Sequence, residues 1–332
     1  MAKKLTTFGS DSLRAMSRTQ GSCRRFSIVR LGGEQGGQSK QFLRRAETDP
    51  YGKTKSRARG EPTYVARSAH KLIQLDQQFR IFPTPARSSP RTGFRVLDLG
   101  AAPGGWSEVV LERLAHLHSH PAISSSPSPS APSETPPSNR NLLARSSVNH
   151  SHRLVACDLL PLHPSIAPKV SKNVDFHAIQ GDFMDAQVRA KIVELLFDST
   201  AVAHDHDNQG PVPEESRQEK ETSDRRRTTT IILSDMLHSM TGIPTRDSQN
   251  SLDLSVTVAD LARDLIPPNP GGSRASDTLI LKHLQSEFTH QFRDRLLAEW
   301  SLVKWVKPLA SRSESREGYF VTRGRRKQWI VE

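Results

Sequence analysis

The sequence predicts an α/β fold with a doubly wound, mostly parallel sheet of seven strands and helices on both faces. The first observation behind this prediction is that short apolar or β-branched runs alternate with helical patterns along much of the 332-residue chain. This alternation is typical of parallel strands joined by helical crossovers. The second observation is that most of these runs end beside a polar residue, as they do where a ligand binds beyond the carboxyl ends of parallel strands.

The individual elements follow from local patterns taken in order along the chain. Residues 94–99 form an apolar strand that ends before Gly100, and the helix after it has its apolar residues on one side. The run Thr-Thr-Thr-Ile-Ile-Leu at 228–233 is almost continuously β-branched or apolar, so we expect it at the buried centre of the sheet. The predicted strands span 94–99, 153–157, 174–179, 228–233, 278–281, 302–306 and 319–322. The predicted helices span 104–117, 186–197, 252–265 and 287–300.

Polar residues lie at or near the ends of five predicted strands. They are Asp98, Asp158, Asp182, Asp235 and Lys282. Because the carboxyl ends of parallel strands meet at one edge, we expect these residues to form one site. Asp158 stands where a carboxylate can accept hydrogen bonds from a ribose diol, and Asp182 could accept one from an adenine amine. Taken alone, each aspartate is equally well explained as the cap of its own loop.

A glycine-rich turn follows the first predicted strand. Its small residues let a ligand approach the backbone, and the next helix offers free N–H groups at its start. The turn matches neither the Gly-x-Gly-x-x-Gly dinucleotide fingerprint nor a Walker A loop, and it has no cationic anchor. It therefore favours a cofactor that carries a carboxylate and a sulfonium over one that carries phosphates. The predicted cofactor contacts in this turn are Asp98, Gly100, Ala101, Pro103, Gly104, Gly105 and Trp106.

The formal net charge of +12 is concentrated at the start of the chain. Residues 1–60 hold 14 Lys and Arg against 4 Asp and Glu, a balance of 14 − 4 = +10. Residues 1–31 are rich in Arg, Ser and Thr with a single acid, a composition typical of an organelle transit peptide. The alternative is a basic tail on a cytosolic or nuclear protein. We divide the chain into a basic arm with a glycine-rich joint at 1–39 and a single domain at 40–330.

Composition also bears on the partners of the domain. Segments at about 119–147, rich in Ser and Pro, and 199–227, without apolar periodicity, are expected to be disordered insertions. Between 40 and 71, nine basic and three acidic residues are interspersed with aromatics, which suits phosphate contacts and base stacking in RNA. Two cysteines and no Cys/His cluster predict no zinc site. No apolar run approaches the roughly 20 residues of a membrane span. We expect a monomer that needs neither a metal nor a membrane.

Seven short stretches form an ordered set along the chain. They are RSAHKL at 67–72, DLGAAPGGWSE at 98–108, ACDLLPLHP at 156–164, VDFHAIQGDF at 174–183, SDMLHSMTG at 234–242, LILKHL at 279–284 and SRSESREGYFVTRGRRK at 311–327. With the two insertions removed, the set resembles the FtsJ-like family of RNA ribose 2′-O-methyltransferases, in its mitochondrial large-subunit ribosomal RNA branch, over about residues 40–330. The resemblance implies a Rossmann-like methyltransferase fold and S-adenosylmethionine as the methyl donor.

The resemblance also implies a catalytic tetrad of the pattern Lys-Asp-Lys-Glu. It places this tetrad at Lys71, Asp235, Lys282 and Glu317, with Asp235 also beside the cofactor. A ribose 2′-hydroxyl is a weak acid, so an enzyme must align it with the methyl group and help to remove its proton. We expect Lys282 to act as the base or as a stabiliser of the alkoxide, and Lys71 to steer the ribose and its phosphate. Any one lysine alone is better explained by an ordinary ion pair.

The substrate implied by the resemblance is a uridine ribose in the peptidyl-transferase A-loop of mitochondrial large-subunit ribosomal RNA, methylated in the matrix in support of ribosome assembly. Ribose groups of the tRNA anticodon loop or of the mRNA cap are alternative substrates, and a non-catalytic RNA-binding assembly factor is an alternative class. The sequence departs from the family at Leu237-His238, where an Ala-Pro pair is usual. This loop borders the target nucleotide in the family, so the departure bears on substrate choice.

Overall fold

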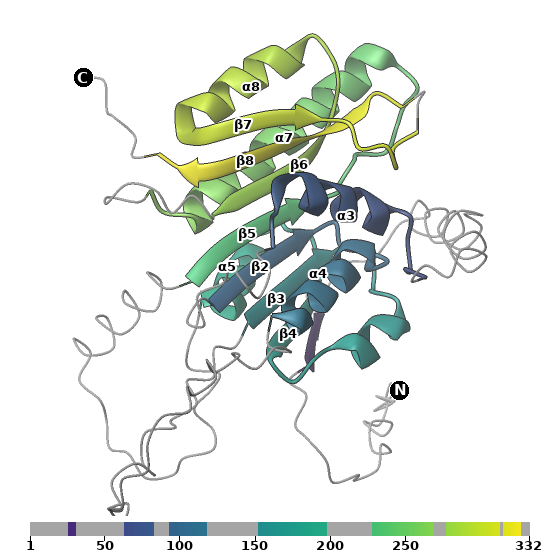
Figure 1. Cartoon of the computed structure of the whole chain (residues 1–332). Coiled ribbons are helices and arrows are strands. Elements are labelled where there is room, and N and C mark those ends of the chain that lie inside the picture. Colours follow the sequence, from purple (N-terminus) through teal and green to yellow (C-terminus); the bar gives the residue numbers. More distant parts are fainter. Residues whose placement is uncertain are drawn as a thin grey trace, which may run out of the picture.

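The computed structural model describes residues 63–82, 93–117, 152–197, 228–268, 277–312 and 315–326, together with the backbone of residues 26–30. Most of the predicted basic arm and both predicted insertions, 119–147 and 199–227, lie outside the described residues. The described part of the chain forms a single sheet with helices on both faces, as the sequence predicts (Figure 1).

The elements begin and end close to their predicted bounds in most cases. The strands are β1 (Phe26–Arg30), β2 (Gly93–Leu99), β3 (His152–Asp158), β4 (Val174–Gln180), β5 (Thr228–Ser234), β6 (Thr278–Leu284), β7 (Trp300–Val306) and β8 (Glu317–Arg325). The helices are α3 (Ser68–Phe79), α4 (Gly105–His116), the 3-10 turn η1 (Pro164–Lys169), α5 (Ala186–Phe197), α7 (Pro244–Leu265) and α8 (Phe288–Glu299).

The strand order in the sheet is β1-β4-β3-β2-β5-β6-β8-β7. The first six of these strands are parallel to one another. The exception is β8, which inserts antiparallel between β6 and β7. Because β8 runs in the opposite direction, its first residue, Glu317, pairs with Leu284 at the carboxyl end of β6. The first residue of β8 therefore lies at the edge of the sheet where the parallel strands end.

The sheet has eight strands because the N-terminal segment adds β1 to the seven that the sequence predicts. This strand pairs in parallel with β4, from Phe26 opposite Phe176 to Arg30 opposite Gln180. The segment was assigned to the basic arm, and no strand was predicted there. The run is only five residues long, lies between Arg-rich and Gly-rich segments, and forms its hydrogen bonds with a strand about 150 positions later, which local pattern does not reveal.

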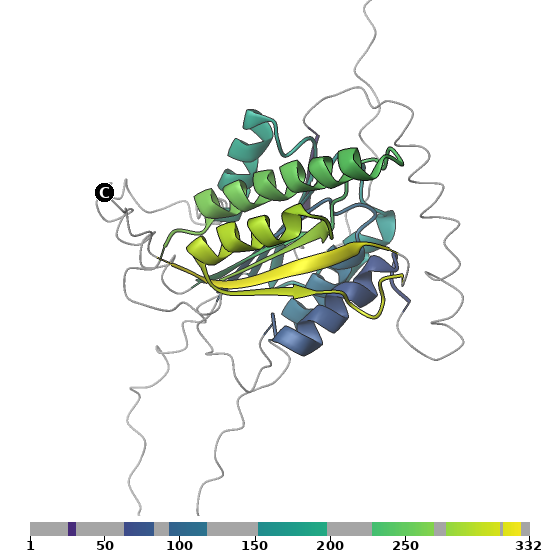
Figure 2. The same cartoon turned by 90° about the horizontal axis from the view of Figure 1, so that it is seen from above.

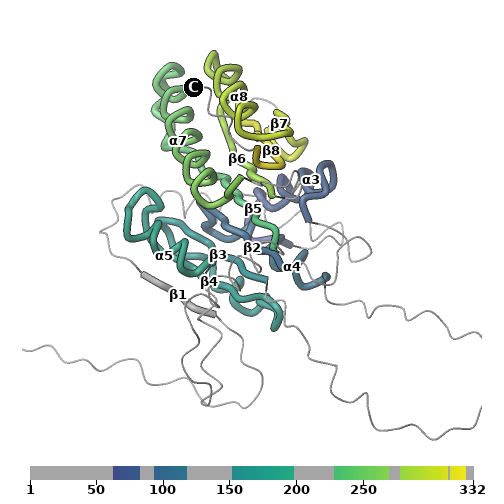
Figure 3. The backbone as a smooth tube through the Cα atoms, turned by 90° about the vertical axis from the view of Figure 1, so that its left-hand side faces the viewer, coloured from purple at the N-terminus to yellow at the C-terminus, as the bar shows by residue number. Residues whose placement is uncertain are grey.

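The two faces of the sheet bury separate apolar cores. Side chains alternate along each strand, so in β2 Val96 belongs to one core and Leu97 to the other, and both are fully buried. Helices α3 and α4 cover the first face, where Leu72 packs, while α5, α7 and α8 cover the second, where Ile192 packs. Figures 2 and 3 show these two helical layers on opposite sides of the strands.

Helix α7 begins at Pro244 rather than at the predicted residue 252. Residues 244–251 are polar and have no apolar periodicity, so the sequence pattern indicates no helix there. The structure places buried polar side chains, Asp247, Ser248 and Ser251, on the inner side of this added stretch. The Ser251 hydroxyl accepts a hydrogen bond from the backbone N–H of Leu284 at 2.9 Å. Ser251 thus faces the end of β6, and hydrogen bonds take the place of apolar packing on this part of the helix.

Candidate active site

Two lysines and two carboxylates meet at the carboxyl edge of the sheet. Lys71 comes from α3, Asp235 directly follows β5, Lys282 lies on β6, and Glu317 begins β8. Lys71 Nζ is 2.6 Å from Glu317 Oε1, and Lys282 Nζ is 2.6 Å from Asp235 Oδ1. Lys282 Nζ also donates to the Asp235 carbonyl oxygen at 2.8 Å and is 4.0 Å from Glu317 Oε2. The four residues named from the sequence thus form one cluster.

The cluster is largely shielded from solvent. The four side chains are between 8% and 15% exposed. Two ammonium groups and two carboxylates can share such a site because each charge has an opposite partner. An ammonium has three protons to donate, so Lys71 keeps donor capacity beyond its bond to Glu317. The arrangement can therefore hold an additional oxygen close to two cations.

Tyr319 belongs to this cluster, although it was not singled out from the sequence. Its hydroxyl donates to Asp235 Oδ1 at 2.6 Å, and its ring lies 5.8 Å from Lys71 Nζ and 6.0 Å from Lys282 Nζ. Burial, with the nearby Asp235 and Glu317 carboxylates, raises the pKa of Tyr319 well above its ordinary value. The signal that could have identified it is spacing, since a residue two positions after Glu317 in a strand must face the same side.

The glycine-rich turn connects β2 to α4 at the same edge. Gly100 (φ 71°) and Gly104 (φ 118°) both adopt the left-handed region that disfavours side chains. A Cβ at position 100 would collide with the Met236 side chain, so the turn and the segment after Asp235 pack directly on each other. The backbone N–H groups of Gly100 and Ala101 donate to the Cys157 carbonyl at 2.9 and 3.3 Å. These bonds fix the turn against the end of β3.

Asp98 is the most deeply buried acid of the site. It is fully buried on β2 and accepts a hydrogen bond from the Ser107 hydroxyl at 2.6 Å, while its Oδ1 atom has no hydrogen-bond partner among the described residues. Burial is the main cause that raises the pKa of Asp98 to about 7; the Ser107 hydrogen bond opposes this rise, and the negative charges of Asp235 and Asp158 add to it. A buried unpartnered acceptor of this kind favours a ligand that can donate to it.

The two predicted nucleoside-binding aspartates both cap their own loops. Asp158 accepts from the backbone N–H groups of Ala102 and Leu160, each at 2.8 Å, and burial raises its pKa. Asp182 is exposed and accepts from the backbone N–H of Met184 at 2.9 Å. A carboxylate has about four acceptor positions, so these bonds leave capacity for ligand hydroxyl or amine groups. Both side chains lie at the carboxyl edge, as expected.

Trp106, one of the predicted cofactor contacts, has a buried side chain. Its side chain is 2% exposed, and its indole N–H donates to the Ser68 carbonyl at 2.8 Å. The ring also lies 5.7 Å from that of Tyr319. The side chain therefore joins α4 to the start of α3 and lies next to Tyr319. Gly105 allows the same close contact between α4 and α3, because a Cβ at this position would lie 2.9 Å from Ser68 Oγ. Pro103 accepts a backbone hydrogen bond from His163 at 2.9 Å.

The loop with the Leu237-His238 departure is anchored by one buried acid. Asp247, in the first turn of α7, accepts from the Thr241 N–H at 2.8 Å, the Thr241 hydroxyl at 2.7 Å and the Gly242 N–H at 3.1 Å. His238 Nε2 lies 3.4 Å from the same carboxylate. These hydrogen bonds, led by the Thr241 N–H, lower the pKa of Asp247 to about 2. The histidine thus joins the anchor of the loop that follows Asp235.

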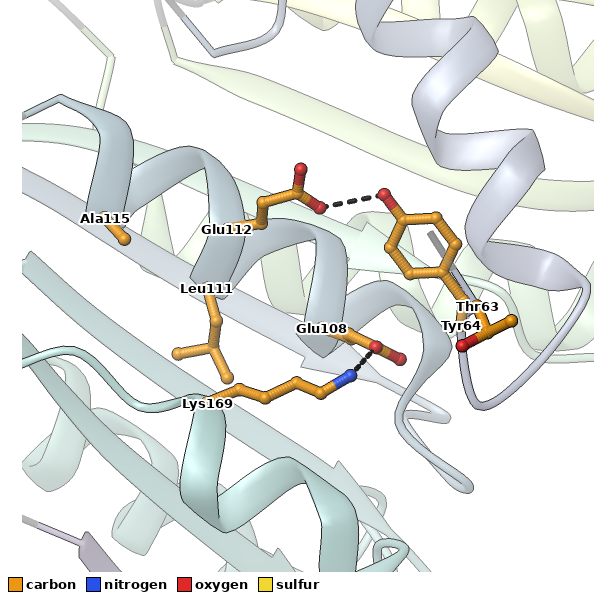
Figure 4. A pocket seen from close by; sticks show the side chains of 7 residues that line it. All are labelled: Thr63, Tyr64, Glu108, Leu111, Glu112, Ala115 and Lys169. Carbon is orange, nitrogen blue, oxygen red and sulfur yellow. Dashed lines mark hydrogen bonds and ion pairs between the residues drawn. The ribbon is translucent and has the colours of Figure 1, made fainter. Parts of the chain in front are cut away.

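A separate cavity of about 270 Å³ lies beside α4 (Figure 4). None of its lining residues belongs to the tetrad or to the glycine-rich turn. Its charged groups are paired: Glu112 accepts from the Tyr64 hydroxyl at 2.8 Å, and Glu108 pairs with Lys169 and accepts from the Val65 N–H at 2.8 Å. These contacts join the segment before α3 to α4 and η1, so we assign the cavity to the packing of these elements.

Two features are absent from the ranges that the structure describes. No group of three or more His, Cys, Asp or Glu is placed to hold a metal ion in these ranges. Within the same ranges, no helix has the length and apolar character to cross a bilayer.

The fold and the site together define a Rossmann-like methyltransferase, with a glycine-rich turn after a central strand and polar groups at the carboxyl edge of the sheet. A model of the family described as FtsJ-like methyltransferase matches residues 64–325. The chain therefore belongs to the FtsJ-like methyltransferase family. The matched range includes all four tetrad residues and the glycine-rich turn.

Two individual proteins are similar to this chain. Ribosomal RNA large subunit methyltransferase E of Bradyrhizobium diazoefficiens is 29% identical over 296 residues, which cover 89% of this chain and 92% of the relative. Among solved structures, a Plasmodium falciparum chain provisionally described as a ribosomal RNA methyltransferase matches with a TM-score of 0.44 and 20% identity, over 78% of this chain and 97% of that one.

Proposed function

We propose that this protein transfers a methyl group from S-adenosylmethionine to a ribose 2′-hydroxyl of RNA. The observation that carries the proposal is the convergence of Lys71, Asp235, Lys282 and Glu317 within hydrogen-bonding distance of one another. Asp235 is followed directly by Met236, which packs against the glycine-rich turn. The tetrad and the proposed cofactor turn are therefore neighbours at one edge of the sheet.

The residues at this edge fit S-adenosylmethionine. Asp98, Asp158 and Asp235 are close enough for the latter two to raise the pKa of Asp98, and a cluster of carboxylates favours a positively charged ligand. The unpartnered Oδ1 of Asp98 can accept a hydrogen bond from a cofactor ammonium. We propose that Asp98 and the glycine-rich turn hold the amino-acid part of the cofactor, and that Asp158 and Asp182 hold its ribose and adenine.

When bound, S-adenosylmethionine supplies a methyl group made electrophilic by its attachment to a positively charged sulfur. The protein must hold the ribose hydroxyl in line with that methyl group and stabilise the charge that develops on the oxygen as its proton leaves. Three oxygens of Asp235 and Glu317 surround Lys282 Nζ, an arrangement that suits an ammonium. Of the two roles expected for Lys282, we therefore favour stabilisation of the alkoxide, with Lys71 steering the ribose.

The proposed substrate is large-subunit ribosomal RNA. The curated relative from Bradyrhizobium is named for methylation of this RNA, and the two chains match over most of their lengths. The resemblance described above extends the proposal to a uridine in the A-loop, with a contribution to ribosome assembly. The basic residues between 40 and 71 suit phosphate contacts.

The proposed location is the mitochondrial matrix. This proposal rests on the basic, Ser-rich and acid-poor composition of residues 1–31. Imaging the full chain and a variant without residues 1–31 tests it. We expect loss of mitochondrial localisation in the shortened protein, and unchanged localisation would remove the argument.

Labelled methyl transfer tests the function. Purified protein is incubated with S-adenosylmethionine that carries a labelled methyl group and with ribosomal RNA or tRNA, and the modified ribose is mapped. We expect label in one uridine of the large-subunit RNA. Label in tRNA alone would favour the anticodon-loop alternative, label in a capped transcript alone would favour the cap alternative, and tight RNA binding without label would favour an assembly factor.

A further inference from the structure

The described residues include six large apolar side chains that are exposed to solvent. They are Leu159, Met184, Val193, Met240, Ile243 and Leu309. Five of the six lie in loops at the carboxyl edge of the sheet, where the tetrad lies, and only Val193 lies elsewhere, on α5. Single exposed apolar residues are common on proteins, but their concentration beside one site indicates a contact surface.

The five residues divide between two halves of the edge. Leu159 and Met184 adjoin Asp158 and Asp182, which we assign to the cofactor. Met240 and Ile243 lie in the loop after Asp235, and Leu309 lies in the connection between β7 and β8 that leads to Glu317. The latter three side chains therefore flank the tetrad from the two loops that adjoin it in sequence.

Leu309 is the most exposed of the six, at 94%. It occupies the second position of a four-residue turn closed by a hydrogen bond from the Ser311 N–H to the Pro308 carbonyl at 2.9 Å. Pro308 and Ser311 are buried, which leaves Leu309 at the tip. A leucine held in this position has no apolar contact to gain within the domain.

The turn is fixed to the helix that carries Lys71. The Arg67 guanidinium donates to the Ala310 carbonyl at 2.9 and 3.2 Å, and Gln74 Oε1 accepts from the Ala310 N–H at 2.9 Å. Positions 67, 71 and 74 lie on one face of α3, four and seven residues apart. The backbone of the turn is therefore held along the same face of α3 as Lys71.

Basic side chains accompany the apolar ones. Lys307, Arg312 and Arg316 are exposed around the β7–β8 turn, and Arg246 is exposed in the first turn of α7 beside the other loop. Arg316 also contacts the Ser248 hydroxyl at 3.5 Å, which links the two loops. Cations together with apolar tips match a nucleic-acid strand, whose phosphates take the cations and whose unstacked bases take the apolar contacts.

We propose that the Pro308–Ser311 turn and the loop with Met240 and Ile243 bind an unstacked nucleotide of the RNA substrate. In this proposal the side chain of Leu309 contacts a base. The inference rests on the proposed function and adds to it the surface of this chain that contacts the unstacked nucleotides of the substrate. Proteins reach RNA bases mainly where these are unstacked. Leu309 supplies apolar contact, and the surrounding cations supply phosphate contacts that do not depend on sequence.

Binding measurements test the proposal without relying on catalysis. The probes are a fluorescently labelled hairpin RNA with a single-stranded loop and a duplex RNA of equal length without a loop, and the readout is fluorescence anisotropy. Leu309→Ala should weaken binding of the hairpin about fivefold, because the apolar contact with the base is lost, and should leave duplex binding unchanged. Val193→Ala, the matched control on α5, should change neither.

Replacement by lysine separates base contact from simple charge attraction. Leu309→Lys should weaken hairpin binding, because an ammonium replaces the apolar tip. Tighter hairpin binding by this variant would show that the turn contacts phosphate alone and would overturn the proposal, as would wild-type affinity in Leu309→Ala. If Leu309→Ala instead altered self-association of the protein, the tip would belong to a protein interface.

The outcomes also separate this inference from the proposed function. If the wild-type protein methylates RNA but Leu309→Ala binds the hairpin normally, the proposed function stands and the inference is wrong. A wild-type protein that neither binds nor methylates RNA would remove both. Thermal unfolding of each variant serves as the folding control, and we expect no change because Leu309 is almost fully exposed.

Discussion

At the scale of single residues, the site is built from side chains whose charges are balanced by close partners. Lys71 and Lys282 each bind a carboxylate at 2.6 Å. Asp98 is the exception, since it is fully buried, has one partner and carries a pKa raised to about 7 by its burial. Such a group is poorly accommodated without a ligand, and functional sites commonly concentrate groups of this kind.

Substitution of Lys282 tests the role of the tetrad. Lys282→Ala should lower the rate of methyl transfer on the order of 100-fold or more, because a cation that stabilises developing charge is lost. Cofactor affinity, measured by calorimetry, should stay at the wild-type value because Lys282 lies outside the glycine-rich turn. Lys191→Ala, which breaks an exposed pair with Glu194, is the control and should be fully active. Full activity in Lys282→Ala would exclude the proposed role.

Asp98 predicts a dependence of stability on pH. Its folded pKa of about 7 lies above the ordinary value of 3.8. Between about pH 4 and pH 7 the folded state therefore retains a proton that the unfolded state has released, so the contribution of Asp98 to stability falls as pH rises. Asp98→Asn removes this effect. The melting temperature of the variant, relative to wild type, should rise between pH 4 and 7 and level off above pH 7; a difference independent of pH would contradict the assignment.

At the scale of elements, the first turn of α7 organises the loop that follows β5. Three hydrogen bonds from Thr241 and Gly242 converge on Asp247, and His238 lies against the same carboxylate. The other end of the loop begins at Asp235, so the anchor fixes both the tetrad and the exposed Met240. Because the hydrogen bonds lower the pKa of Asp247 to about 2, the carboxylate stays ionised until the solution is strongly acidic.

Removal of this anchor should impair RNA use more than cofactor binding. Asp247→Ala frees the loop, and we expect kcat/KM for RNA to fall on the order of tenfold or more through misplacement of Asp235. Asp253→Ala changes an exposed carboxylate on the same helix that accepts a hydrogen bond from Gln249, and it should behave like wild type. Steady-state kinetics with RNA as the varied substrate provide the measurement. Equal values for the two variants would show that the loop does not depend on its anchor.

The elements also show what the sequence can predict. All seven strands with apolar or β-branched runs occur near their predicted positions, because burial on both faces imposes that pattern. The start of α7 was placed too late because its buried side is polar and satisfied by hydrogen bonds. Among site residues, the four tetrad residues named by resemblance lie together in the structure. Tyr319, which shares their cluster, is not evident from local pattern because its place depends on the pairing of β8 with β6.

At the scale of the whole molecule, the sheet extends beyond the predicted domain. β1 occupies the edge next to β4, and this pairing covers backbone groups that would otherwise be open to another chain. The pairing joins residues of the N-terminal segment to the domain core. Composition alone assigns that segment to the basic arm, because a strand of only five residues is not evident within a long basic stretch.

Two truncations test the contribution of β1. A chain without residues 1–25 keeps the strand, and a chain without residues 1–30 loses it. The longer truncation should lower the melting temperature by roughly 2–4 °C for each kcal/mol of lost pairing and should promote association at high protein concentration. Light scattering and thermal unfolding measure the two effects. If both truncated proteins have the same melting temperature and stay monodisperse, β1 contributes nothing to stability.

The position of β8 determines when the site can exist. It is the last strand that the structure describes, yet it lies between two strands that precede it, and it supplies both Glu317 and Tyr319. During translation, β6 and β7 are synthesised before β8, so the strand that pairs with both of them in the sheet is still missing. A nascent chain without β8 can therefore hold its glycine-rich turn and three of the four tetrad residues, but we expect it to be inactive toward RNA. We therefore expect activity only after β8 has inserted between β6 and β7.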